Sequence, residues 1–364
     1  MSKTRIAIIG TGGIAGAHVN SYLRMKDVEV IGGADIVKGK ARAFLDSFDL
    51  KDAKDYPSAR EMLDALKPDA VSVTTYNSTH AECTVEALRH GCHVLLEKPM
   101  TVTLNEALAI RKAEKAAGKI VTVGFQPRYD VRMQKIKEVI QSGALGKIYY
   151  VQTGGGRFRG IPGGTFIEKQ YAGVGALADI GCYGLDMALN AIGYPRPLTV
   201  SASSFDYFGK SKKYNSPKDA ARFSVDDFCG AFIRLEGGIT LDFRMSWAMH
   251  MDTTGATIFL GTDGGLKVEP SSPGHPWGGA WDGSCGPVTL FHDYLGTPTH
   301  TPIPLPEPKE DNFYLKCRAF VDAVVKGKSA PIPTSEIIYN QAIIDGIIRS
   351  SASGREVSVE FTED

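Results

Sequence analysis

The sequence has no net charge, because its 41 lysines and arginines balance its 41 aspartates and glutamates. A balanced chain sets up no field that would favour nucleic acid or an anionic membrane, so we expect neither as a partner. No unbroken apolar run approaches the roughly 20 residues that span a bilayer. Internal repeats and low-complexity segments are missing as well. With 43% hydrophobic and 23% charged residues, the chain is typical of soluble globular proteins.

Cysteine is scarce and scattered. The six cysteines form no C-x-x-C pair, the spacing that marks many metal and redox sites, so we expect no metal. We interpret the cysteines as reduced, mostly buried thiols of a cytoplasmic protein. The first residues, Met1–Thr4, lead directly into a predicted strand, so we expect no signal peptide.

A glycine-rich turn follows that strand. Ile6–Ile9 is a short apolar run, typical of a buried parallel strand, and it ends in Gly10-x-Gly12-x-x-Ala15 before a helical pattern. Gly10 permits a tight turn, Gly12 lets the backbone approach a pyrophosphate, and Ala15 lets the helix pack on the strand. The turn therefore predicts dinucleotide binding, although a turn without a ligand would use the same glycines.

An acidic residue follows the next predicted strand. Asp35 stands just beyond Val28–Ile31, about 20 residues after the glycines, where an acid would bind the adenosine ribose. The same carboxylate would repel a 2′-phosphate, which favours NAD over NADP. Lys38 and Lys40 are close enough in sequence to leave NADP as an alternative.

Strand and helix patterns alternate as far as residue 123. This alternation predicts an N-terminal domain of residues 1–125 with a doubly wound parallel sheet, a Rossmann fold. The predicted strands are 5–9, 28–33, 69–74, 92–96 and 120–123, and the predicted helices are 13–24, 39–47, 58–66, 79–90 and 104–117.

Residues 126–364 have a different pattern, which predicts an α+β domain with a large, mostly antiparallel open sheet. Its strands are expected near 147–153, 198–205, 227–235, 239–247, 256–260 and 357–361, and its helices near 129–142, 312–326 and 335–351. We interpret 269–310 as a loop with one strand, Val288–Phe291. An exposed sheet face favours self-association, so we expect a homodimer or homotetramer through this sheet.

Ligands of doubly wound sheets bind at the carboxyl ends of the strands. Asn77 and His80 follow the third predicted strand, where they would face a cofactor or only cap the next helix. Glu97-Lys98-Pro99 follows the fourth. Because Pro99 restricts Lys98 to extended conformations, the ammonium is aimed at the crevice, where it can hold a hydroxyl or relay a proton.

The exit from the first domain carries three further candidates. Gln126, Arg128 and Tyr129 follow the fifth predicted strand and could line a cleft, although Arg128 could equally pair with an acid. Arg157 and Arg159 lie in a glycine-rich stretch, where they would bind polar substrate groups or brace backbone carbonyls.

Residues 173–187 are predicted to form an apolar helix with a polar face. Asp179 and Tyr183 are four residues apart and share that face, and Asp186 continues it, unless the face is merely exposed to solvent. Trp247, Trp277 and Trp281 are aromatic candidates for stacking on sugar rings or for rim packing.

Four motifs taken together resemble the Gfo/Idh/MocA family, which includes glucose–fructose oxidoreductase and inositol dehydrogenase. They are Gly10–Ala15, Asp35, Asn77–His80 and Glu97-Lys98-Pro99. The resemblance covers essentially the whole chain, and the Glu-Lys-Pro strand end is its specific part. Tyr76 departs from the proline that such sequences often carry before the asparagine.

The resemblance extends to the helix at 173–187, which is similar to the family pattern G-G-x-L-x-D-x-G-x-H-x-x-D. Tyr183 stands where many members have histidine, although members such as glucose–fructose oxidoreductase carry tyrosine there. A tyrosine hydroxyl titrates far above neutral pH, so it needs a nearby cation to act as a base, and Lys98 is the candidate. Alternatively, Tyr183 only positions a hydroxyl and Lys98 relays the proton.

The expected site therefore has three groups of residues. We expect cofactor contacts from Gly10, Thr11, Gly12, Gly13, Ile14, Asp35, Thr75, Asn77, His80, Glu97, Lys98 and Gln126. We expect substrate contacts from Lys98, Arg128, Tyr129, Arg157, Arg159, Asp179 and Tyr183. The expected catalytic residues are Lys98, Asp179 and Tyr183.

The function implied by the resemblance is an NAD(P)-dependent sugar or polyol dehydrogenase that moves a hydride between a hydroxyl-bearing carbon and nicotinamide. One alternative is an NAD-dependent glycosidase or lyase that oxidises the sugar only transiently, with no net redox change. A remote alternative is a non-catalytic regulator that senses the dinucleotide, which would not need the three catalytic residues.

Overall fold

The computed structural model describes residues 3–271 and 285–361. Trp277 and Trp281 lie outside the described residues. The chain forms two compact units. The first comprises the chain up to Gln126 together with Glu310–Ile338, and the second comprises Pro127–Lys309 together with the segment from Tyr339.

The first unit is built on a parallel sheet, as predicted, but the sheet has six strands where five were predicted. Its strands are β1 (Thr4–Ile9), β2 (Val28–Ala34), β3 (Lys54–Tyr56), β4 (Ala70–Val73), β5 (His93–Leu96) and β6 (Val121–Val123). They are ordered β3-β2-β1-β4-β5-β6, the arrangement of dinucleotide-binding sheets, in which the strand order reverses between the parallel neighbours β1 and β4. The short edge strand β3 was not predicted, because its three polar residues show no apolar alternation.

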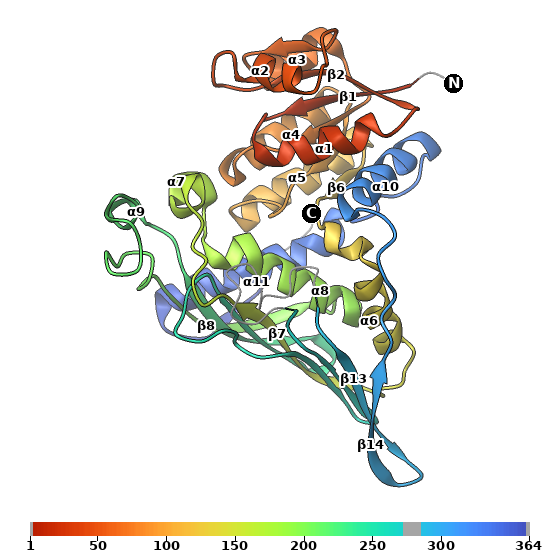
Figure 1. The fold of residues 1–364 in the computed structure, drawn as a ribbon, viewed down its shortest axis with the longest axis vertical. Helices are drawn as coiled ribbons and strands as arrows, with labels where there is room; N and C mark the ends of the chain where they lie inside the picture. Colours follow the sequence, from red (N-terminus) through yellow and green to blue (C-terminus); the bar gives the residue numbers. More distant parts are fainter. Residues whose placement is uncertain (1–2, 272–284, 362–364) are drawn as a thin grey trace. The chain divides into compact units, whose positions relative to one another are not determined.

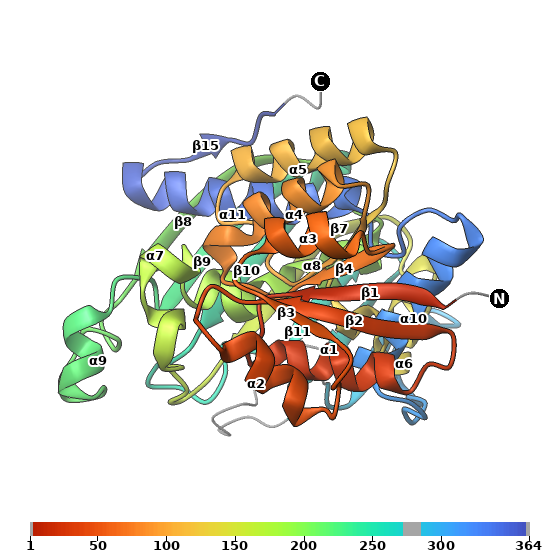
Figure 2. The ribbon, with the colours of Figure 1, turned by 90° about the horizontal axis from the view of Figure 1, so that it is seen from above.

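Helices cover both faces of this sheet. They are α1 (Gly13–Leu23), α2 (Lys40–Ser47), α3 (Ala59–Leu66), α4 (His80–Arg89) and α5 (Leu104–Ala117). Figure 2 shows α1 and α2 on one side of the parallel strands and α3, α4 and α5 on the other. The helix α5 begins with a capping box between Thr103 and Glu106 and ends at Gly118 with φ +60°, so local sequence fixes both of its ends.

A late segment of the chain completes this unit. The helix α10 (Asn312–Lys326) packs against α1, and its Phe320 joins the core around Ile8 and Tyr22. Farther along, Ile332 accepts a hydrogen bond from the Val123 N–H in β6 at 3.1 Å. The first unit therefore depends on residues that lie more than half the chain away in sequence.

The second unit holds a nine-stranded sheet. Its strands are β7 (Ile148–Gly156), β8 (Pro197–Phe205), β9 (Phe228–Leu235), β10 (Ile239–Ser246), β11 (Thr257–Gly261), β12 (Gly264–Val268), β13 (Val288–Tyr294), β14 (Thr297–Ile303) and β15 (Val357–Ser358). All neighbouring strands are antiparallel except β7 and β10, which confirms the predicted open and mostly antiparallel sheet. The strand β7 runs three residues beyond the predicted end, because Gly154, Gly155 and Gly156 still pair with β10. A Cβ on Gly154 would lie 1.7 Å from Arg244 O, so only glycine fits there.

The prediction of one strand within 269–310 was wrong. Two strands, β13 and β14, form a hairpin at the edge of the nine-stranded sheet, seen extending from it in Figure 1. The strand β14 contains Pro298 and Pro302, which an edge strand tolerates because one of its sides needs no ladder. The prolines and the absence of apolar alternation concealed this strand in the sequence.

Helices pack on one face of the second sheet. The helices of this unit are α6 (Val131–Gln141), α7 (Lys169–Ala172), α8 (Cys182–Ile192), α9 (Pro217–Arg222) and α11 (Thr334–Ser353), whose residues from Tyr339 belong to this unit; of these, α6, α8 and α11 cover the sheet. Figure 1 shows α6, α8 and α11 on the same face. On the other face, side chains such as Phe232 alternate with buried neighbours along β9 and remain exposed.

One helical stretch, Lys169–Ile192, is long and apolar enough on average to cross a membrane. However, 89% of the tested window is buried inside the protein, and the core helix of a globular protein passes the same test. The sequence shows no unbroken apolar run here because Asp179 and Asp186 interrupt it. The stretch is weak support for a membrane span.

All six cysteines carry free thiols, and four of them are buried. The buried ones are Cys92, Cys182, Cys229 and Cys317. This agrees with the prediction of reduced, mostly buried cysteines, while the cytoplasmic localisation stays a prediction.

Candidate active site

The glycine turn after β1 has the geometry that a bound pyrophosphate requires. Gly10 adopts φ +86°, and a Cβ there would lie 2.7 Å from Thr75 Cγ2, so this position accepts only glycine. Gly12 is the N-cap of α1 and has no side-chain cap, and a Cβ on Gly12 or Gly13 would meet no atom within 4 Å. The first N–H groups of α1 are therefore open, and no acidic residue lies in its first turn.

Asp35 holds this turn from the end of β2. Its Oδ2 accepts hydrogen bonds from Thr11 N at 3.0 Å and Thr11 Oγ1 at 2.8 Å, and its Oδ1 accepts one from Val37 N at 2.9 Å. Lys40 Nζ lies 2.9 Å from Oδ2. Burial alone would raise the pKa of Asp35, but Lys40 and these donors lower it, so the carboxylate stays charged. The contact of Asp35 with a ribose stays a prediction.

The segment after β4 braces two neighbouring turns. Thr74 Oγ1 donates to Gly10 O at 2.6 Å, which ties the end of β4 to the glycine turn. His80 is 1% exposed, and its Nδ1–H donates to Pro99 O at 2.8 Å. Burial lowers the pKa of His80, so its ring is neutral. Thr75 and Asn77 are half-buried beside them, and the cofactor contacts predicted for Thr75, Asn77 and His80 stay predictions.

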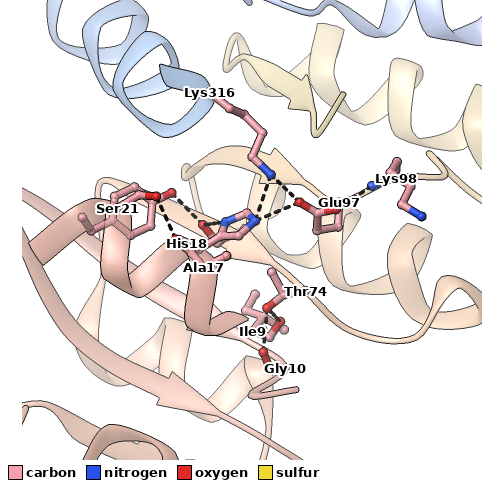
Figure 3. Close-up of polar contacts among 11 residues, drawn as sticks. Ile9, Gly10, Ala17, His18, Ser21, Thr74, Glu97, Lys98 and Lys316 are labelled. Atoms are coloured by element: carbon pink, nitrogen blue, oxygen red, sulfur yellow. Dashed lines mark hydrogen bonds and ion pairs between the residues drawn. The ribbon is translucent and has the colours of Figure 1, made fainter. Parts of the chain in front are cut away.

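The end of β5 contains a buried charge cluster, drawn in Figure 3. Glu97 is 4% exposed, and its Oε1 lies 2.5 Å from Lys316 Nζ and 2.8 Å from His18 Nε2. Its Oε2 accepts the backbone N–H of Lys98 at 3.3 Å. Lys98 itself is half-buried, and the Lys98–Pro99 peptide bond is cis. The carboxylate of Glu97 is therefore engaged within the protein, and its predicted contact with the cofactor stays a prediction.

Arg128 pairs with an acidic residue, which is one of the two roles that the sequence left open for it. Its Nε donates to Asp186 Oδ2 at 2.9 Å and its Nη2 donates to Asp186 Oδ1 at 2.8 Å, a bidentate ion pair. Tyr194 OH accepts from Nη2 at 2.6 Å and donates to Asp186. Asp186 is fully buried, with Arg128 as its partner, and its place on the face of Asp179 stays a prediction.

The predicted helix at 173–187 is not uniform. It opens with a π-helical segment, Leu177–Gly181, which carries Asp179 and continues directly into α8 with Tyr183 in its first turn. Such widened turns occur often at functional sites. Asp179 is half-buried and Tyr183 is 8% exposed.

A buried carboxylate caps this helix. Asp226 Oδ1 accepts the Gly175 N–H at 2.7 Å, and Oδ2 accepts the Leu177 N–H at 2.8 Å. A Cβ on Gly175 would lie 1.9 Å from Asp226 O, so glycine is required for this approach. Burial raises the pKa of Asp226 despite the two donors.

Trp247 is not a stacking platform for sugars. Its side chain is fully buried, and its Nε1–H donates to Asp179 Oδ2 at 3.0 Å. This bond could not be predicted from the sequence, because 68 residues separate its two partners. Trp247 thus fixes the orientation of the Asp179 carboxylate.

The two arginines of the glycine-rich stretch mainly hold the chain together. Arg157 is 3% exposed and its Nη1 donates to Gly160 O at 3.3 Å. Arg159 Nη1 donates to the carbonyls of Phe158 and Met249, and its guanidinium lies 4.7 Å from the Phe208 ring centroid. The substrate contacts of both arginines stay predictions.

In the first unit, three strand ends line up. Because β4 lies between β1 and β5, the bare glycine turn, the Thr74–His80 segment and Glu97–Lys98 follow one another along one edge of the sheet. The open N-terminus of α1 and the uncrowded Gly12 and Gly13 fit the pyrophosphate of a dinucleotide. Within residues 3–271 and 285–361, no group of three or more His, Cys, Asp or Glu side chains could hold a metal ion.

His18, Lys316 and Asp226 were not predicted from the sequence, and Trp247 was predicted only as an aromatic contact, not as the partner of Asp179. One signal was available for Lys316: it lies four residues before Phe320, on the apolar stripe of its helix. A lysine on the buried face of a helix needs a partner. The sequence does not say which acid that partner is.

Family comparisons agree with both parts of the fold. Residues 4–125 match the family model GFO_IDH_MocA, described as an oxidoreductase family with an NAD-binding Rossmann fold. Residues 133–267 match the GFO/IDH/MocA C-terminal domain.

Among curated relatives, D-glucoside 3-dehydrogenase of Escherichia coli K12 is 34% identical over 274 residues, 71% of this chain and 78% of the relative. Inositol 2-dehydrogenase of Salmonella paratyphi B is 34% identical over 145 residues, 39% of this chain and 43% of the relative. Among solved structures, levoglucosan dehydrogenase with NADH and levoglucosan gives a TM-score of 0.81 at 20% identity, covering 98% of this chain and 100% of that one. The aldose-aldose oxidoreductase of Caulobacter crescentus gives 0.77 at 21% identity, covering 98% and 99%.

Proposed function

The chain belongs to the Gfo/Idh/MocA family of NAD-binding oxidoreductases, and on this basis we propose that it oxidises a hydroxyl-bearing carbon of a sugar, polyol or glycoside. The observation that carries the proposal is the edge of the six-stranded sheet. There, the bare glycine turn after β1 and Lys98 after β5 are separated only by the end of β4. The dehydrogenases of D-glucosides and inositols among the relatives support this substrate class.

In the proposed reaction the substrate loses two hydrogens and becomes a ketone or lactone. Its carbon gives up a hydride, which NAD accepts when bound, and its oxygen gives up a proton, so the products are the carbonyl compound, NADH and H⁺. An alcohol C–H is a poor hydride donor until its hydroxyl loses the proton. The chain must therefore supply a base.

Lys98, Asp179 and Tyr183 are the residues to which we assign this proton. Lys98 acts as the base in its neutral amine form: it accepts the hydroxyl proton, stabilises the developing alkoxide as the ammonium, and releases the proton to solvent as H⁺. Tyr183 contributes a hydroxyl from the first turn of α8, and Asp179, oriented by Trp247, orients the substrate hydroxyl. The contacts of Gly10–Ile14 and Asp35 with the dinucleotide belong to the same proposal.

The test measures NADH formation by its near-ultraviolet absorbance, with NAD or NADP and a panel of D-glucose, myo-inositol and methyl β-D-glucopyranoside. We expect stoichiometric NADH with one panel member. Lys98→Met should lower kcat by about 1,000-fold while the affinity for NAD changes by less than about threefold. Tyr183→Phe and Asp179→Asn should each lower kcat by about 10- to 100-fold.

Three other results would each overturn part of the proposal. NAD-dependent release of methanol from the glycoside without net NADH would make this a redox-assisted glycosidase. Full turnover by Lys98→Met would remove Lys98 from the proton chemistry. Tight NAD binding without turnover of the panel would favour the regulator alternative.

We also propose that the chain self-associates through the exposed face of its nine-stranded sheet. Phe232 is 44% exposed there, beside a groove of about 420 Å³ lined by residues that include Ser201, Asp242 and Arg244. Asp242 and Arg244 form an ion pair with each other on this face, and a two-fold axis would bring two such faces together. Light scattering should give a dimer or tetramer, and Phe232→Asp should shift it to the monomer; a monomeric wild type would contradict the proposal.

A further inference from the structure

The charged side chain of Lys316 lies buried inside the first unit. It is fully buried on α10, although lysine is almost never buried without a partner. Its Nζ lies 2.5 Å from Glu97 Oε1 and 3.2 Å from His18 Nε2, and 4.6 Å from the centroid of the Phe313 ring. Figure 3 shows the ammonium pointing from α10 at the end of β5.

Glu97 connects this ammonium to the backbone of Lys98. One carboxylate oxygen faces Lys316 and His18, while the other accepts the Lys98 N–H. The strand next to it leaves room for the carboxylate, because a Cβ on Gly124 would lie 2.8 Å from Glu97 Oε1. The position of the Glu97 side chain is thus set from α1, α10 and the end of β6 together.

The hydrogen bonds beyond His18 lead away from solvent. His18 Nδ1 lies 3.0 Å from Ser72 Oγ, which lies 2.7 Å from Tyr22 OH. His18 and Ser72 are fully buried, and Tyr22 is 1% exposed. A chain that ends in the core offers a proton no exit, so these contacts hold the cluster in place.

We propose that Lys316 is a positioning residue for Lys98: with His18 it fixes the Glu97 carboxylate, and Glu97 fixes the strand end from which the Lys98 side chain departs. The inference rests on the proposed role of Lys98 in the proton transfer. A buried ion pair is a poor source of net stability, since well-packed apolar residues often do as well. What an apolar pair could not supply is an acceptor for the Lys98 N–H and for His18.

The charge state of the cluster follows from its surroundings. The titratable groups that face Glu97 are His18 and Tyr22 from α1, His80 from α4, Lys316 and Cys317 from α10, and Lys98 from its own segment. Burial alone would raise the pKa of Glu97, but Lys316 and His18 hold it well below its usual range. Burial and Lys316 together lower the pKa of His18.

Removal of Lys316 should make the cluster sensitive to pH. Without the ammonium the pKa of His18 rises, because the repulsion is gone and the attraction of Glu97 remains. At low pH a proton shared by His18 and Glu97 then replaces the lost charge. At high pH that proton leaves, and the carboxylate is buried without a cation. Activity of the variant should therefore fall as the pH rises, relative to the wild type.

The experiment compares Lys316→Met with the wild-type full chain, using the best substrate of the panel, from about pH 6 to about pH 9. We expect the ratio of kcat values, variant to wild type, to fall by about tenfold across this range, with KM changed by less than about threefold. Adding His18→Asn to Lys316→Met should abolish this pH dependence. Lys316→Arg should retain a cation and restore most of the activity.

The matched control is Lys326→Met on the same helix. Lys326 is 54% exposed in its side chain and pairs only with Asp322 among its described contacts. Its kcat and pH profile should equal those of the wild type.

A second experiment does not need turnover: Lys98 is acetylated by acetic anhydride in the absence of NAD, and the extent of acetylation is measured by mass spectrometry. Its pH midpoint should rise by about half a unit in Lys316→Met and stay unchanged in Lys326→Met.

Each outcome decides the inference. If Lys98→Met is inactive but Lys316→Met loses activity only in proportion to its folded fraction, with a profile parallel to the wild type, Lys316 is structural and only this inference fails. If Lys98→Met turns over normally, the proposed role of Lys98 fails, and the positioning role of Lys316 fails with it. An unchanged acetylation midpoint in Lys316→Met also counts against the inference.

Discussion

Two helices that carry functional residues begin in opposite ways. At the start of α1, Gly12 provides no side-chain cap, and the space around Gly12 and Gly13 is open. At the start of the helix that carries Asp179, both oxygens of Asp226 accept backbone N–H groups, from Gly175 and Leu177. The two helix starts therefore differ in where the acceptor for their first N–H groups comes from.

The comparison shows that a helix N-terminus can either bind a ligand or be capped by the protein itself. Every helix start presents unpaired N–H groups and the positive end of a dipole. In α1 these groups remain available, and a ligand phosphate can satisfy them. In the second helix the protein supplies its own carboxylate, so this end is closed to ligands and the helix serves as a fixed support for side chains farther along it.

The largest effect is expected when a side-chain cap is introduced at the uncapped start of α1. Gly12→Asp would place a carboxylate at the N-cap of α1, where it caps the helix and repels a pyrophosphate. We expect the affinity for NAD, measured by calorimetry, to fall by about 100-fold or more, while the unfolding free energy stays equal or rises by about 1 kcal/mol.

Gly12→Ala is the matched control for that change. Its Cβ meets no protein atom, and the φ of −78° suits alanine, so the fold should be unaffected. NAD affinity should fall less than in Gly12→Asp, because only bulk is added. Unchanged NAD binding in Gly12→Asp would show that the open end is not the phosphate site.

The next largest effect is expected when the Asp226 cap is removed from the helix that carries Asp179. Asp226→Ala leaves two buried N–H groups without acceptors, which should cost about 1–3 kcal/mol of unfolding free energy in denaturant titration. Because Asp179 lies in the turn that these bonds anchor, kcat should fall by about tenfold. Asp226→Asn keeps one acceptor oxygen and should lie between the wild type and Asp226→Ala. Equal stability of all three would mean that solvent replaces the cap.

The smallest expected effect is on the pH dependence of stability, and it concerns Asp227, the residue after the capping Asp226. Burial raises the pKa of Asp227 to about 6, although its carboxylate accepts the Gly209 N–H at 2.6 Å. The folded state then holds a proton that the unfolded chain has released, so this group lowers stability as the pH rises from about 4 to about 6. Asp227→Asn should flatten the pH dependence of the melting temperature in that range. A parallel curve for the variant would show that Asp227 titrates normally.

The glycine turn and the uncapped start of α1 could be predicted from the sequence, because the residues that form them are close together in the chain. The strand, the glycines and the following helix lie within residues 4–23, and each follows from composition and spacing over a few residues. Asp35 was also placed correctly near the turn, since the next parallel strand must end beside it. The predicted parallel sheet followed from the same alternation.

The closed end and the charge cluster could not be predicted, because their partners are remote. Asp226 lies 51 residues from Gly175, and Lys316 lies 219 residues from Glu97. Periodicity shows that a helix buries one face, but it does not show which buried acid meets which donor. Arg128 illustrates the limit: its residue type fits a substrate or an acid equally, and only the structure shows Asp186 as its partner.

The chain order of the first unit has a consequence for synthesis. A ribosome releases the six parallel strands early, but Lys316 and the Ile332 contact to β6 emerge only after the whole of Pro127–Lys309 has been made. Until then Glu97 has no cation, and the apolar face of α1 that receives Phe320 is bare. The nascent first unit therefore stays incomplete until the segment from Glu310 has been made. A stop codon placed just before α10 would leave both the cluster and the core unfinished.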